Sequence, residues 1–382
     1  MKLAAPWVQD DAVQQVCAAI AGGGHGVWFV GGCVRNALIG AGATDIDITT
    51  DARPDRVTAL AEAAGLRVVP TGITHGTVTI IAQSRPFEVT TLRRDVATDG
   101  RHATVAFAET LAEDAGRRDF TINALYATPD GTVVDPLGGM VDLLARRVRF
   151  IGAAQDRIRE DYLRILRFFR FHAWFADPDG GIDAEGLAAC AADLDGLARL
   201  SRERVGAEMR KLLAAPDPAP AVAAMAVSGV LAHLLPGASA LLLPVLVHVE
   251  QMAALPPDPI RRLAALGGEG IAEALRLSRA EAARLEALRD AIGSGVEPGE
   301  LGYRHGAAEA VDVLALRAAA MGLEIDPVQA EQARFGATQT CPVRAADLPE
   351  TLKGPAIGAR LREVEARWIA SGFTLDRAAL LR

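Results

Sequence analysis

The stretch from Trp28 to Gly40 constrains the fold more than any other part of this 382-residue chain. Its apolar start, Trp28–Val30, predicts a β-strand. The pair Gly31-Gly32 then predicts a turn in which backbone N–H groups can approach a ligand closely. A short helix beginning there would point free N–H groups and its positive dipole end at any anion near the turn. Arg35 lies one turn inside this helix and could reach the same anion.

A second strand is expected over Asp45–Thr50, directly after this helix. Because side chains alternate along a strand, Asp45 and Asp47 should share one face, while Ile46 and Ile48 face the core. Neighbouring carboxylates repel each other unless a cation lies between them, and hard oxygen ligands suit Mg²⁺. The sequence therefore predicts a phosphate site followed by a metal site. A purely structural glycine turn and a solvated Asp-x-Asp at a strand edge are the alternatives for each half taken alone.

The length and composition indicate two to four domains rich in helix. Half of the residues are hydrophobic and only 5% are aromatic, which favours helical packing over β-sandwiches. The net charge of −8 argues against broad, non-specific binding of polyanions. It leaves open the binding of RNA by a local basic face.

Cysteine spacing and hydropathy indicate a cytoplasmic protein. Cys17, Cys33, Cys190 and Cys341 are far apart and form no CxxC pair, so neither a zinc site nor a disulfide framework is expected. The sequence has no signal-peptide pattern at its start and no run of 18 apolar residues. We therefore expect no membrane association.

The next segments predict alternating helices and strands. Helices are expected over residues 9–21 and 54–64, and a hairpin over Thr77–Ala82 and Phe87–Leu92. Glu88, early in the second of these strands, could supply a third carboxylate near the Asp pair, or could simply face solvent. The charged, turn-rich residues 93–106 are interpreted as a mobile loop beside the site, or as an ordinary surface loop.

A polar cluster is expected in the segment 113–125, which is interpreted as a helix. On a helix, Arg118, Asp119 and Asn123 would share one side, and such a cluster suits ribose and phosphate. A solvated helix face is the alternative. The run Val148–Ile151 is expected to be the last strand of this α/β region.

After Gly152 the pattern is helical. A helix is expected from Glu160 to Phe171, with charged residues recurring every three positions on one side. Those residues are Asp161, Arg164, Arg167 and Arg170. An Arg stripe is often merely solvated, but a planar Arg fork beside a carboxylate also recognises the edges of nucleobases. Ser201 should start a helix that runs to about Leu213, and prolines then break the chain.

A series of motifs stands in a fixed order along the chain. These motifs are Gly31-Gly32-Cys33-Val34-Arg35, Asp45-Ile46-Asp47, His75-Gly76-Thr77-Val78, Glu88-Val89-Thr90-Thr91, Arg117–Leu125, and Glu160-Asp161 with Arg164, Arg167 and Arg170. In this order and spacing, residues 25–215 resemble the class II tRNA nucleotidyltransferase and poly(A) polymerase family, and the resemblance continues more weakly into the tail.

This resemblance implies an α+β N-terminal polymerase-beta-like nucleotidyltransferase head, followed by all-α neck, body and tail domains. The expected boundaries are 1–150 for the head, 151–215 for the neck, 216–320 for the body and 321–382 for the tail. The head would hold the metal and the triphosphate, the neck would carry the base-reading helix, and the tail would bind tRNA. The absence of a His-Asp dyad after residue 215 indicates that the phosphohydrolase domain of some relatives is missing.

The resemblance also implies residue roles. Asp45 and Asp47 would bind two Mg²⁺ ions and carry the catalysis, and Gly31, Gly32 and Arg35 would hold the triphosphate. The segment with Arg118, Asp119 and Asn123 would hold the ribose. Asp161 and Arg164 would read the incoming base, with Arg167 and Arg170 binding phosphate or holding Asp161. Asn36 stands where the family usually has Asp, and His102-Ala103 replaces a common His/Arg-Pro.

The expected activity is the addition of C, C and A from CTP and ATP to the 3′ end of tRNA that lacks all or part of CCA. A poly(A) polymerase, a partial CC- or A-adding enzyme, and a noncatalytic tRNA-binding protein of the same fold are the alternatives. No obligate protein partner is expected. A basic face on the helical domains should contact tRNA phosphates. Its candidates are Arg199, Arg202, Arg204, Arg210 and Lys211.

Overall fold

The computed structural model describes the whole chain apart from residues 43–44, 73–75, 100–101 and 350. His75, which belongs to one of the motifs above, lies outside the described residues. The chain forms two compact units, each of which takes part of the segment around residues 209–234.

The first unit comprises Met1–Glu208 and Pro220–Leu234, and the second comprises Met209–Ala219 and Leu235–Arg382. The first unit contains all of the described β-strands, and the second unit is mainly helical. The expectation of an α+β N-terminal part followed by all-α parts is therefore confirmed. The finer division into four domains stays a prediction.

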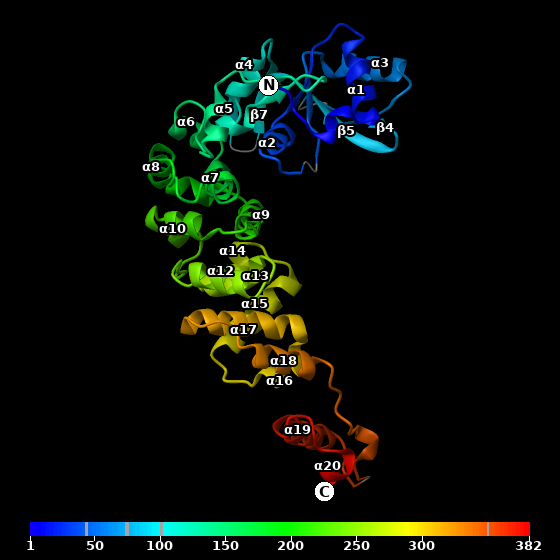
Figure 1. Cartoon of the computed structure of the whole chain (residues 1–382), viewed down its shortest axis with the longest axis vertical. Helices are drawn as coiled ribbons and strands as arrows, with labels where there is room; N and C mark the ends of the chain where they lie inside the picture. The colour runs from blue at the N-terminus through cyan, green and yellow to red at the C-terminus, as the bar shows by residue number, and fades with distance from the viewer. Residues whose placement is uncertain (43–44, 73–75, 100–101, 350) are drawn as a thin grey trace. The chain divides into compact units, whose positions relative to one another are not determined.

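A mixed seven-stranded sheet forms the framework of the first unit, with strand order β3-β4-β5-β2-β1-β8-β9. Neighbouring strands pair antiparallel except β2 and β5, which are parallel. The strands of this sheet are β1 (Val27–Val30), β2 (Ile48–Thr50), β3 (Arg67–Gly72), β4 (Thr77–Ala82), β5 (Arg85–Thr91), β8 (Tyr126–Ala127) and β9 (Val133–Val134). Figure 1 shows helices α1 (Asp11–Ala21) and α3 (Pro54–Ala63) beside β4 and β5.

The predicted hairpin is confirmed. Its turn is Gln83-Ser84, whose φ angles of 49° and 64° fit the two-residue turns that match the twist of paired strands. The predicted helices over 9–21 and 54–64 are also confirmed. In α1, the Asp10 carboxylate accepts hydrogen bonds from the backbone N–H groups of Ala12 and Val13 and so begins the helix.

Two β predictions were wrong. Residues 93–106 do not form a loop, because β6 (Arg93–Asp99) and β7 (His102–Phe107) pair as a second, two-stranded sheet. Conversely, Val148–Ile151 is no strand: Phe150 makes one isolated bridge, to Phe120. The rings of these two residues lie 5.0 Å apart and pack in the buried core instead.

The first unit contains further helices besides α1 and α3. They are η1 (Pro6–Gln9), α2 (Gly32–Leu38), α4 (Leu111–Gly116), η3 (Thr121–Asn123), α5 (Gly139–Leu144), α6 (Ala154–Glu160), α7 (Leu163–Phe175), α8 (Ala184–Ala192), η4 (Leu194–Arg199) and α11 (Val230–Leu234). Helices α9 (Arg202–Leu213) and α10 (Ala219–Val227) begin in one unit and end in the other.

The two helices expected to carry site residues are each interrupted. The helix predicted over 113–125 ends at Gly116, and the short 3-10 turn η3 follows, so Arg118 and Asp119 are not helical. The helix predicted from Glu160 begins only at Leu163, and Asp161 lies in the extended break between α6 and α7. The start of α9 near Ser201 and its end at Leu213 are as predicted.

Aromatic packing fixes α7 against the sheet-bearing part of the first unit. The Phe168 ring stacks on Phe150 at 5.3 Å, and the Phe171 ring lies 5.0 Å from that of Phe120. All four rings are buried, so α7 cannot slide without exposing a large apolar area. The polar side of α7 is thereby held against the segment around Asp119.

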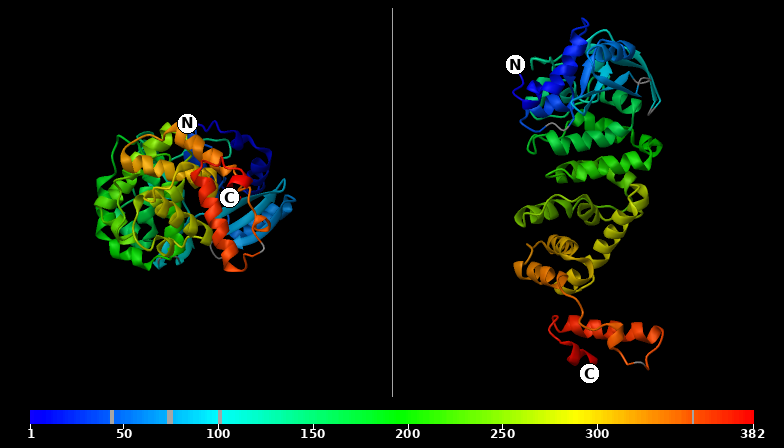
Figure 2. Two further views of the ribbon diagram at one scale, coloured as in Figure 1. Left: turned by 90° about the horizontal axis from the view of Figure 1, so that it is seen from below. Right: turned by 90° about the vertical axis from the view of Figure 1, so that its right-hand side faces the viewer.

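Apart from one isolated bridge between Ala238 and Gly267, the regular structure described for the second unit consists of helices (Figure 2). These are α12 (Leu243–Met252), α13 (Pro259–Leu266), α14 (Ile271–Ala274), α15 (Arg279–Ile292), α16 (Pro298–His305), α17 (Ala307–Met321), α18 (Pro327–Ala337), η5 (Ala345–Asp347), α19 (Pro355–Ala370) and α20 (Arg377–Leu381). Across the described part of the chain, none of the helices is both long and apolar enough to cross a membrane.

A buried ion network ties several of these helices together. Arg261 pairs with Glu250 at 2.8 Å and with Asp312 at 2.6 Å, and Arg262 pairs with Glu250 at 2.7 Å. Arg262 also donates to the carbonyl oxygen of Leu213, at 2.6 Å, and so caps the end of α9. These four charged side chains are almost fully buried, so each depends on its partners.

Candidate active site

The Gly31-Gly32 turn joins β1 to α2 and lies between two guanidinium groups. Gly31 has φ 74°, a backbone conformation that side chains rarely adopt. A Cβ atom built on Gly31 would lie 3.4 Å from Arg118 Nη1, and one on Gly32 would lie 3.8 Å from Arg35 Nη2. Because α2 has only seven residues, we attribute the positive charge at this turn to the two arginines more than to the helix dipole.

The two predicted catalytic carboxylates lie just before β2, not on it, because that strand begins at Ile48. Asp47 still lies beside β1, since its carbonyl oxygen accepts from Val30 N at 3.0 Å. In the parallel pair of β2 and β5, Ile48 is opposite Val89 and both are buried. The residues directly before them, Asp47 and Glu88, therefore lie side by side on the exposed face.

Negative charge is concentrated around Asp47, because Asp45 and Glu88 lie near it. Partial burial raises the pKa of Asp47; Arg118 opposes that rise, and the nearby carboxylates of Glu88 and Asp45 add to it. Carboxylate oxygens that repel one another are suitable ligands for a hard divalent cation, so the donor set fits such a metal. Within the described residues, however, no group of three or more His, Cys, Asp or Glu side chains lies close enough together to form a complete metal site.

Arg118 lies near both the Gly31-Gly32 turn and the carboxylate of Asp47. Its Nη2 lies 3.0 Å from Asp114 Oδ2, and its Nε lies 3.3 Å from the hydroxyl oxygen of Tyr126. Tyr126 itself donates to Asp114 at 2.8 Å, and the Asp114 side chain is fully buried. Asp114 and Tyr126 thus orient the guanidinium so that its remaining Nη1 faces Gly31.

A second chain of contacts links Asp119 to Asn123, Arg35 and Arg167. Asp119 accepts from Asn123 Nδ2 at 2.8 Å and from Arg167 Nε at 2.7 Å. Asn123 in turn accepts from Arg35 Nη1. Burial alone would raise the pKa of Asp119, but Arg167 and Asn123 outweigh it and hold that pKa below its usual value. The structure therefore brings these predicted site residues together, although they are not on one helix and all but Arg167 are buried.

Arg35 is held mainly by packing. Its guanidinium carbon lies 3.9 Å from the centroid of the Phe175 ring and 5.2 Å from that of Phe171. Burial lowers the pKa of Arg35 to about 10, and the charge is partly compensated by Asp119. The neutral Asn36 accepts from Arg35 Nη2 at 2.9 Å, so the residue that departs from the family pattern still orients this arginine.

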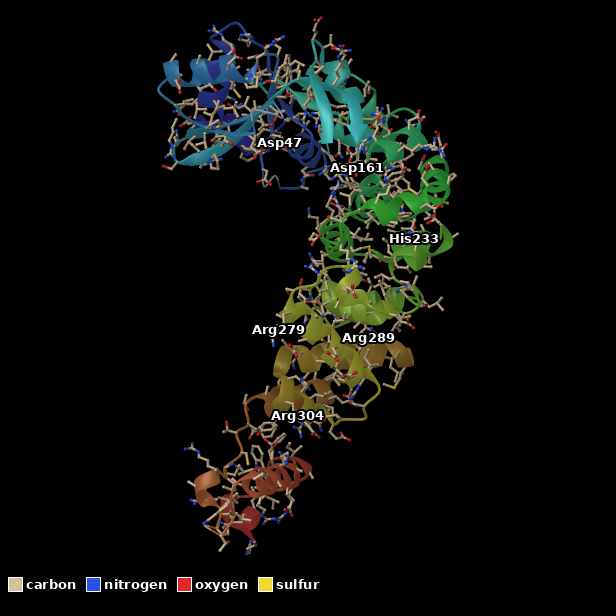
Figure 3. The ribbon with its side chains drawn as sticks, turned by 180° about the vertical axis from the view of Figure 1, so that it is seen from behind. Asp47, Asp161, His233, Arg279, Arg289 and Arg304 are labelled. Atoms are coloured by element: carbon tan, nitrogen blue, oxygen red, sulfur yellow. The ribbon has the colours of Figure 1, made fainter. Side chains whose placement is uncertain are left out.

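The side chains of Asp161 and Arg164 each pair with a different residue. Asp161 Oδ1 accepts from Leu163 N at 3.1 Å, while Oδ2 pairs with Arg204 at 2.6 Å. Arg164 pairs with Glu160 at 2.6 Å. Figure 3 shows Asp161 at the start of the green helices and Asp47 at the sheet-bearing part of the same unit.

The last two arginines of the predicted stripe also have acidic partners. Arg167 binds Asp119, and Arg170 Nε lies 2.5 Å from Glu208 Oε2. Arg204 makes the ion pair with Asp161. Burial would lower the pKa of Arg167, but Asp119, Glu208 and Asp161 together hold it above its usual value. A role of Arg167 or Arg170 in holding Asp161 stays a prediction. An isolated, solvated Arg stripe is ruled out for these residues.

Four structural partners were missed by sequence reasoning. They are Asp114, Tyr126, Glu208 and, in its contact with Asp161, Arg204. Asp114 could have been found, because it precedes Arg118 by four residues in the segment predicted to be a helix. The others are distant along the chain and left no local signal.

The candidate tRNA-contacting residues differ in their surroundings. Arg199 lies over the Tyr162 ring at 5.4 Å, Arg204 pairs with Asp161, and Arg210 lies 3.9 Å from Glu281. Arg202 and Lys211 are exposed. The role of this group in RNA binding stays a prediction.

Two family models match the chain. The model described as the poly A polymerase head domain matches residues 27–149, which include the glycine turn, the carboxylates and Arg118. A second, described as a probable RNA and SrmB binding site of polymerase A, matches residues 181–242.

Curated relatives and solved structures carry consistent names. The chain is 42% identical over 217 residues to the mitochondrial CCA tRNA nucleotidyltransferase 1 of Mus musculus, a match that covers 56% of this chain and 50% of the relative. It is 40% identical over 204 residues to a CCA-adding enzyme of Streptococcus pyogenes, covering 53% and 49%. These matches thus span about half the length of the curated relatives.

The crystal structure of a Bacillus stearothermophilus CCA-adding enzyme in complex with CTP superposes with a TM-score of 0.76 at 28% identity, covering 96% of this chain and 94% of that one. A Thermotoga maritima CCA-adding enzyme complexed with tRNA has the same fold, with a TM-score of 0.70 at 18% identity and coverage of 99% and 95%.

Proposed function

The chain belongs to the class II CCA-adding enzyme and poly(A) polymerase family, and we propose that it adds C, C and A from CTP and ATP to the 3′ end of tRNA. The observation that supports this most strongly is the convergence of Arg118, the Gly31-Gly32 turn and the carboxylate of Asp47 in one place. Transfer of a nucleotidyl group requires a site that binds the triphosphate and a site that binds the metal. The likeness to a CCA-adding enzyme solved with CTP, over almost the whole chain, supports the choice of substrate.

The triphosphate would lie over the glycine turn. The missing side chains of Gly31 and Gly32 let phosphate oxygens approach the backbone, and Arg118 Nη1 and Arg35 Nη2 face the same space. Asp119, Asn123 and Arg167 would then surround the ribose. In this arrangement the protein positions the α-phosphorus for attack by the 3′ hydroxyl of the RNA, and pyrophosphate leaves.

Asp45 and Asp47 would hold Mg²⁺, and Glu88 stands beside Asp47 as a third carboxylate. When bound, Mg²⁺ supplies a Lewis acid that offsets the charge developing on the transferred phosphate and on the leaving group. Burial raises the pKa of Asp47 against the opposing charge of Arg118, and the carboxylates of Glu88 and Asp45 add to that rise, so a bound cation would offset their repulsion.

The base would be read by Asp161 and Arg164. Cytosine and adenine both present an amine beside a ring-nitrogen acceptor, which suit a carboxylate acceptor and a guanidinium donor. Uracil and guanine present a carbonyl beside an N–H. The Asp161 carboxylate would then face another acceptor, and the Arg164 guanidinium would face another donor. An unsatisfied buried polar group costs roughly 1–3 kcal/mol. One protein pair could thus accept CTP and ATP without a template.

We further propose that the head, neck, body and tail follow the boundaries 1–150, 151–215, 216–320 and 321–382. A reducing compartment such as the cytoplasm would suit the four cysteines, all of which are free thiols.

The direct test uses tRNA transcripts that end before CCA, after C and after CC, each incubated with one NTP and Mg²⁺. We expect CTP to extend the first two substrates to CC, and ATP to add a single A to the third. The released pyrophosphate should equal the nucleotides incorporated.

The alternatives give different products. A ladder of long A tails would identify a poly(A) polymerase, and extension of only one class of substrate would identify a partial enzyme. tRNA binding without Mg²⁺-dependent release of pyrophosphate would identify a noncatalytic protein. Any of these results would overturn the proposed activity.

A further inference from the structure

Helix α9 carries two charged residues that contact the proposed base-reading segment. Arg204 and Glu208 are four positions apart, so they lie on the same face of the helix. Arg204 Nη2 lies 2.6 Å from Asp161 Oδ2, and Glu208 Oε2 lies 2.5 Å from Arg170 Nε. One face of α9 thus supplies a cation to the acidic member of the segment and an anion to a basic member.

Asp161 depends on this contact because it lies outside regular structure. Its φ of −155° and ψ of 107° place it in the break between α6 and α7, where its backbone carbonyl oxygen accepts from Arg164 N at 2.9 Å. One carboxylate oxygen accepts from Leu163 N at 3.1 Å, and the other is held by Arg204. Two donors, one on each oxygen, fix the plane of the carboxylate.

The carboxylate still has capacity for a ligand. An ionised carboxylate has about four lone-pair sites, and the two contacts with Leu163 and Arg204 occupy only part of them. Loss of the Arg204 contact would leave the hydrogen bond from Leu163 N and the nearby charge of Arg167, neither of which fixes both carboxylate oxygens. The acceptor would then no longer point in one direction.

The two proposed base-reading groups are held by different elements. Arg164 is fixed by Glu160 of α6 at 2.6 Å and by the carbonyl oxygen of Arg117 at 3.1 Å. Asp161 is fixed from α9. A change at Arg204 should therefore disturb Asp161 and leave Arg164 in place.

We propose that Arg204 is a positioning residue that sets the direction of the Asp161 carboxylate and thereby the preference for CTP and ATP over UTP and GTP. This inference rests on the proposed role of Asp161 in reading the base. It assigns Arg204 to nucleotide selection, whereas the sequence alone suggested a contact with tRNA phosphate.

The test compares Arg204→Ala and Arg204→Lys with the wild-type chain on tRNA ending in CC, with all four NTPs. We expect Arg204→Ala to lower the ratio of kcat/KM for ATP over GTP by about tenfold, the scale of one lost charge-assisted hydrogen bond. Arg204→Lys keeps a cation near Asp161 and should retain most of the preference. The ratio of kcat/KM for CTP over UTP, measured on tRNA that lacks CCA, should likewise fall most in Arg204→Ala and less in Arg204→Lys.

A matched control is Arg159→Ala, which also removes an arginine paired with an aspartate, Asp193, at 3.2 Å. Arg159 lies on α6 and its side chain is half exposed, so this variant should keep the wild-type ratio. Thermal melting of each variant shows whether it is folded, and Arg204→Lys provides the comparison if Arg204→Ala is not.

A double variant separates positioning from an independent role. If Arg204 acts through Asp161, adding Arg204→Ala to Asp161→Ala should change the nucleotide ratio no further. An unchanged ratio in Arg204→Ala, an equal loss for all four NTPs, or a fully additive double variant would overturn the inference. So would weaker tRNA binding with a smaller salt dependence and an intact ratio, since that result identifies a phosphate contact.

These outcomes differ from a failure of the proposed function. If the wild-type chain incorporates neither CTP nor ATP, the activity itself is wrong. If the wild-type chain selects these nucleotides and Arg204→Ala does so equally well, only the inference about Arg204 is wrong.

Discussion

Replacement of Asp114 by asparagine tests whether a buried carboxylate organises the triphosphate site. Asp114 is fully buried and accepts from Arg117 at 2.9 Å, from Arg118 at 3.0 Å and from the Tyr126 hydroxyl at 2.8 Å. Asparagine has the same shape, but it removes the charge and turns one acceptor into a donor. The change should therefore leave two arginines without their counter-charge.

The expected loss follows from the burial of these partners. Breaking a buried ion pair by removing one member costs about 3–5 kcal/mol. The side chains of Arg117 and Arg118 are 16% and 19% exposed, so water can partly replace the lost partner. We therefore expect the lower end, about 3 kcal/mol, which corresponds to a fall of roughly 6–12 °C in Tm for a unit of this size. The KM for ATP should rise as well, because Arg118 loses its orientation.

The pH dependence gives an independent check. Burial would raise the pKa of Asp114, but Arg118, Arg117 and Tyr126 outweigh that effect and hold the pKa below its usual value. A lowered pKa in the folded state stabilises the fold above the unfolded pKa of about 4, and this stabilisation is lost as the pH falls through the folded pKa. The difference in stability between the wild type and Asp114→Asn should therefore be full at pH 7 and shrink below pH 4.

Denaturant unfolding from pH 7 to pH 3 measures this difference, with Glu62→Gln on the exposed side of α3 as the control. The control should change stability by less than about 0.5 kcal/mol. A loss below about 1 kcal/mol in Asp114→Asn at pH 7 would refute the reasoning. So would a difference that stays constant down to pH 3.

Three further predictions concern the metal, the RNA and the second unit. Asp45→Ala and Asp47→Ala should each abolish nucleotide incorporation while tRNA binding survives; a rate above about a tenth of wild type, or ~1.4 kcal/mol of barrier, contradicts the assignment. tRNA affinity, measured by filter binding, should fall linearly with salt on a log–log plot, and salt-independent affinity would contradict binding through phosphates. Arg262→Ala should destabilise the second unit by about 3–5 kcal/mol in denaturant unfolding, because Glu250 stays buried with a partner lost. A loss within about 0.5 kcal/mol would show that the network is dispensable.

Features encoded by neighbouring residues could be predicted from the sequence. The glycine turn, helices α1 and α3, the hairpin of β4 and β5, and the helix after Ser201 each carry their own start and stop signals. The strands β6 and β7 were hidden because charged and turn-forming residues obscure their alternation. Their pairing with each other, which no local pattern reveals, makes them strands.

The helix predictions failed at two aspartates for the same physical reason. The Asp119 side chain accepts from the N–H of Phe120, and the Asp161 side chain accepts from the N–H of Leu163. Such local bonds offer the backbone an alternative to helical hydrogen bonds, so the helix is interrupted at both places. The spacing of charged residues indicated residues that the structure brings close together but gave the wrong geometry, because each of these two carboxylates also pairs with a distant arginine. Those arginines are Arg167 and Arg204.

The pairing of Arg118 with Asp114 explains how a chain with a net charge of −8 can keep a positive charge at the glycine turn. A guanidinium has five N–H donors in a fixed fork, so one part can bind a carboxylate while another faces a ligand. Arg118 does this: Nε and Nη2 contact Asp114 and Nη1 faces Gly31. A lysine has a single ammonium on a flexible stem and could not keep these two directions apart. The Arg118 charge at the turn is therefore fixed in direction by Asp114, and the local arrangement of this fork matters more than the overall charge.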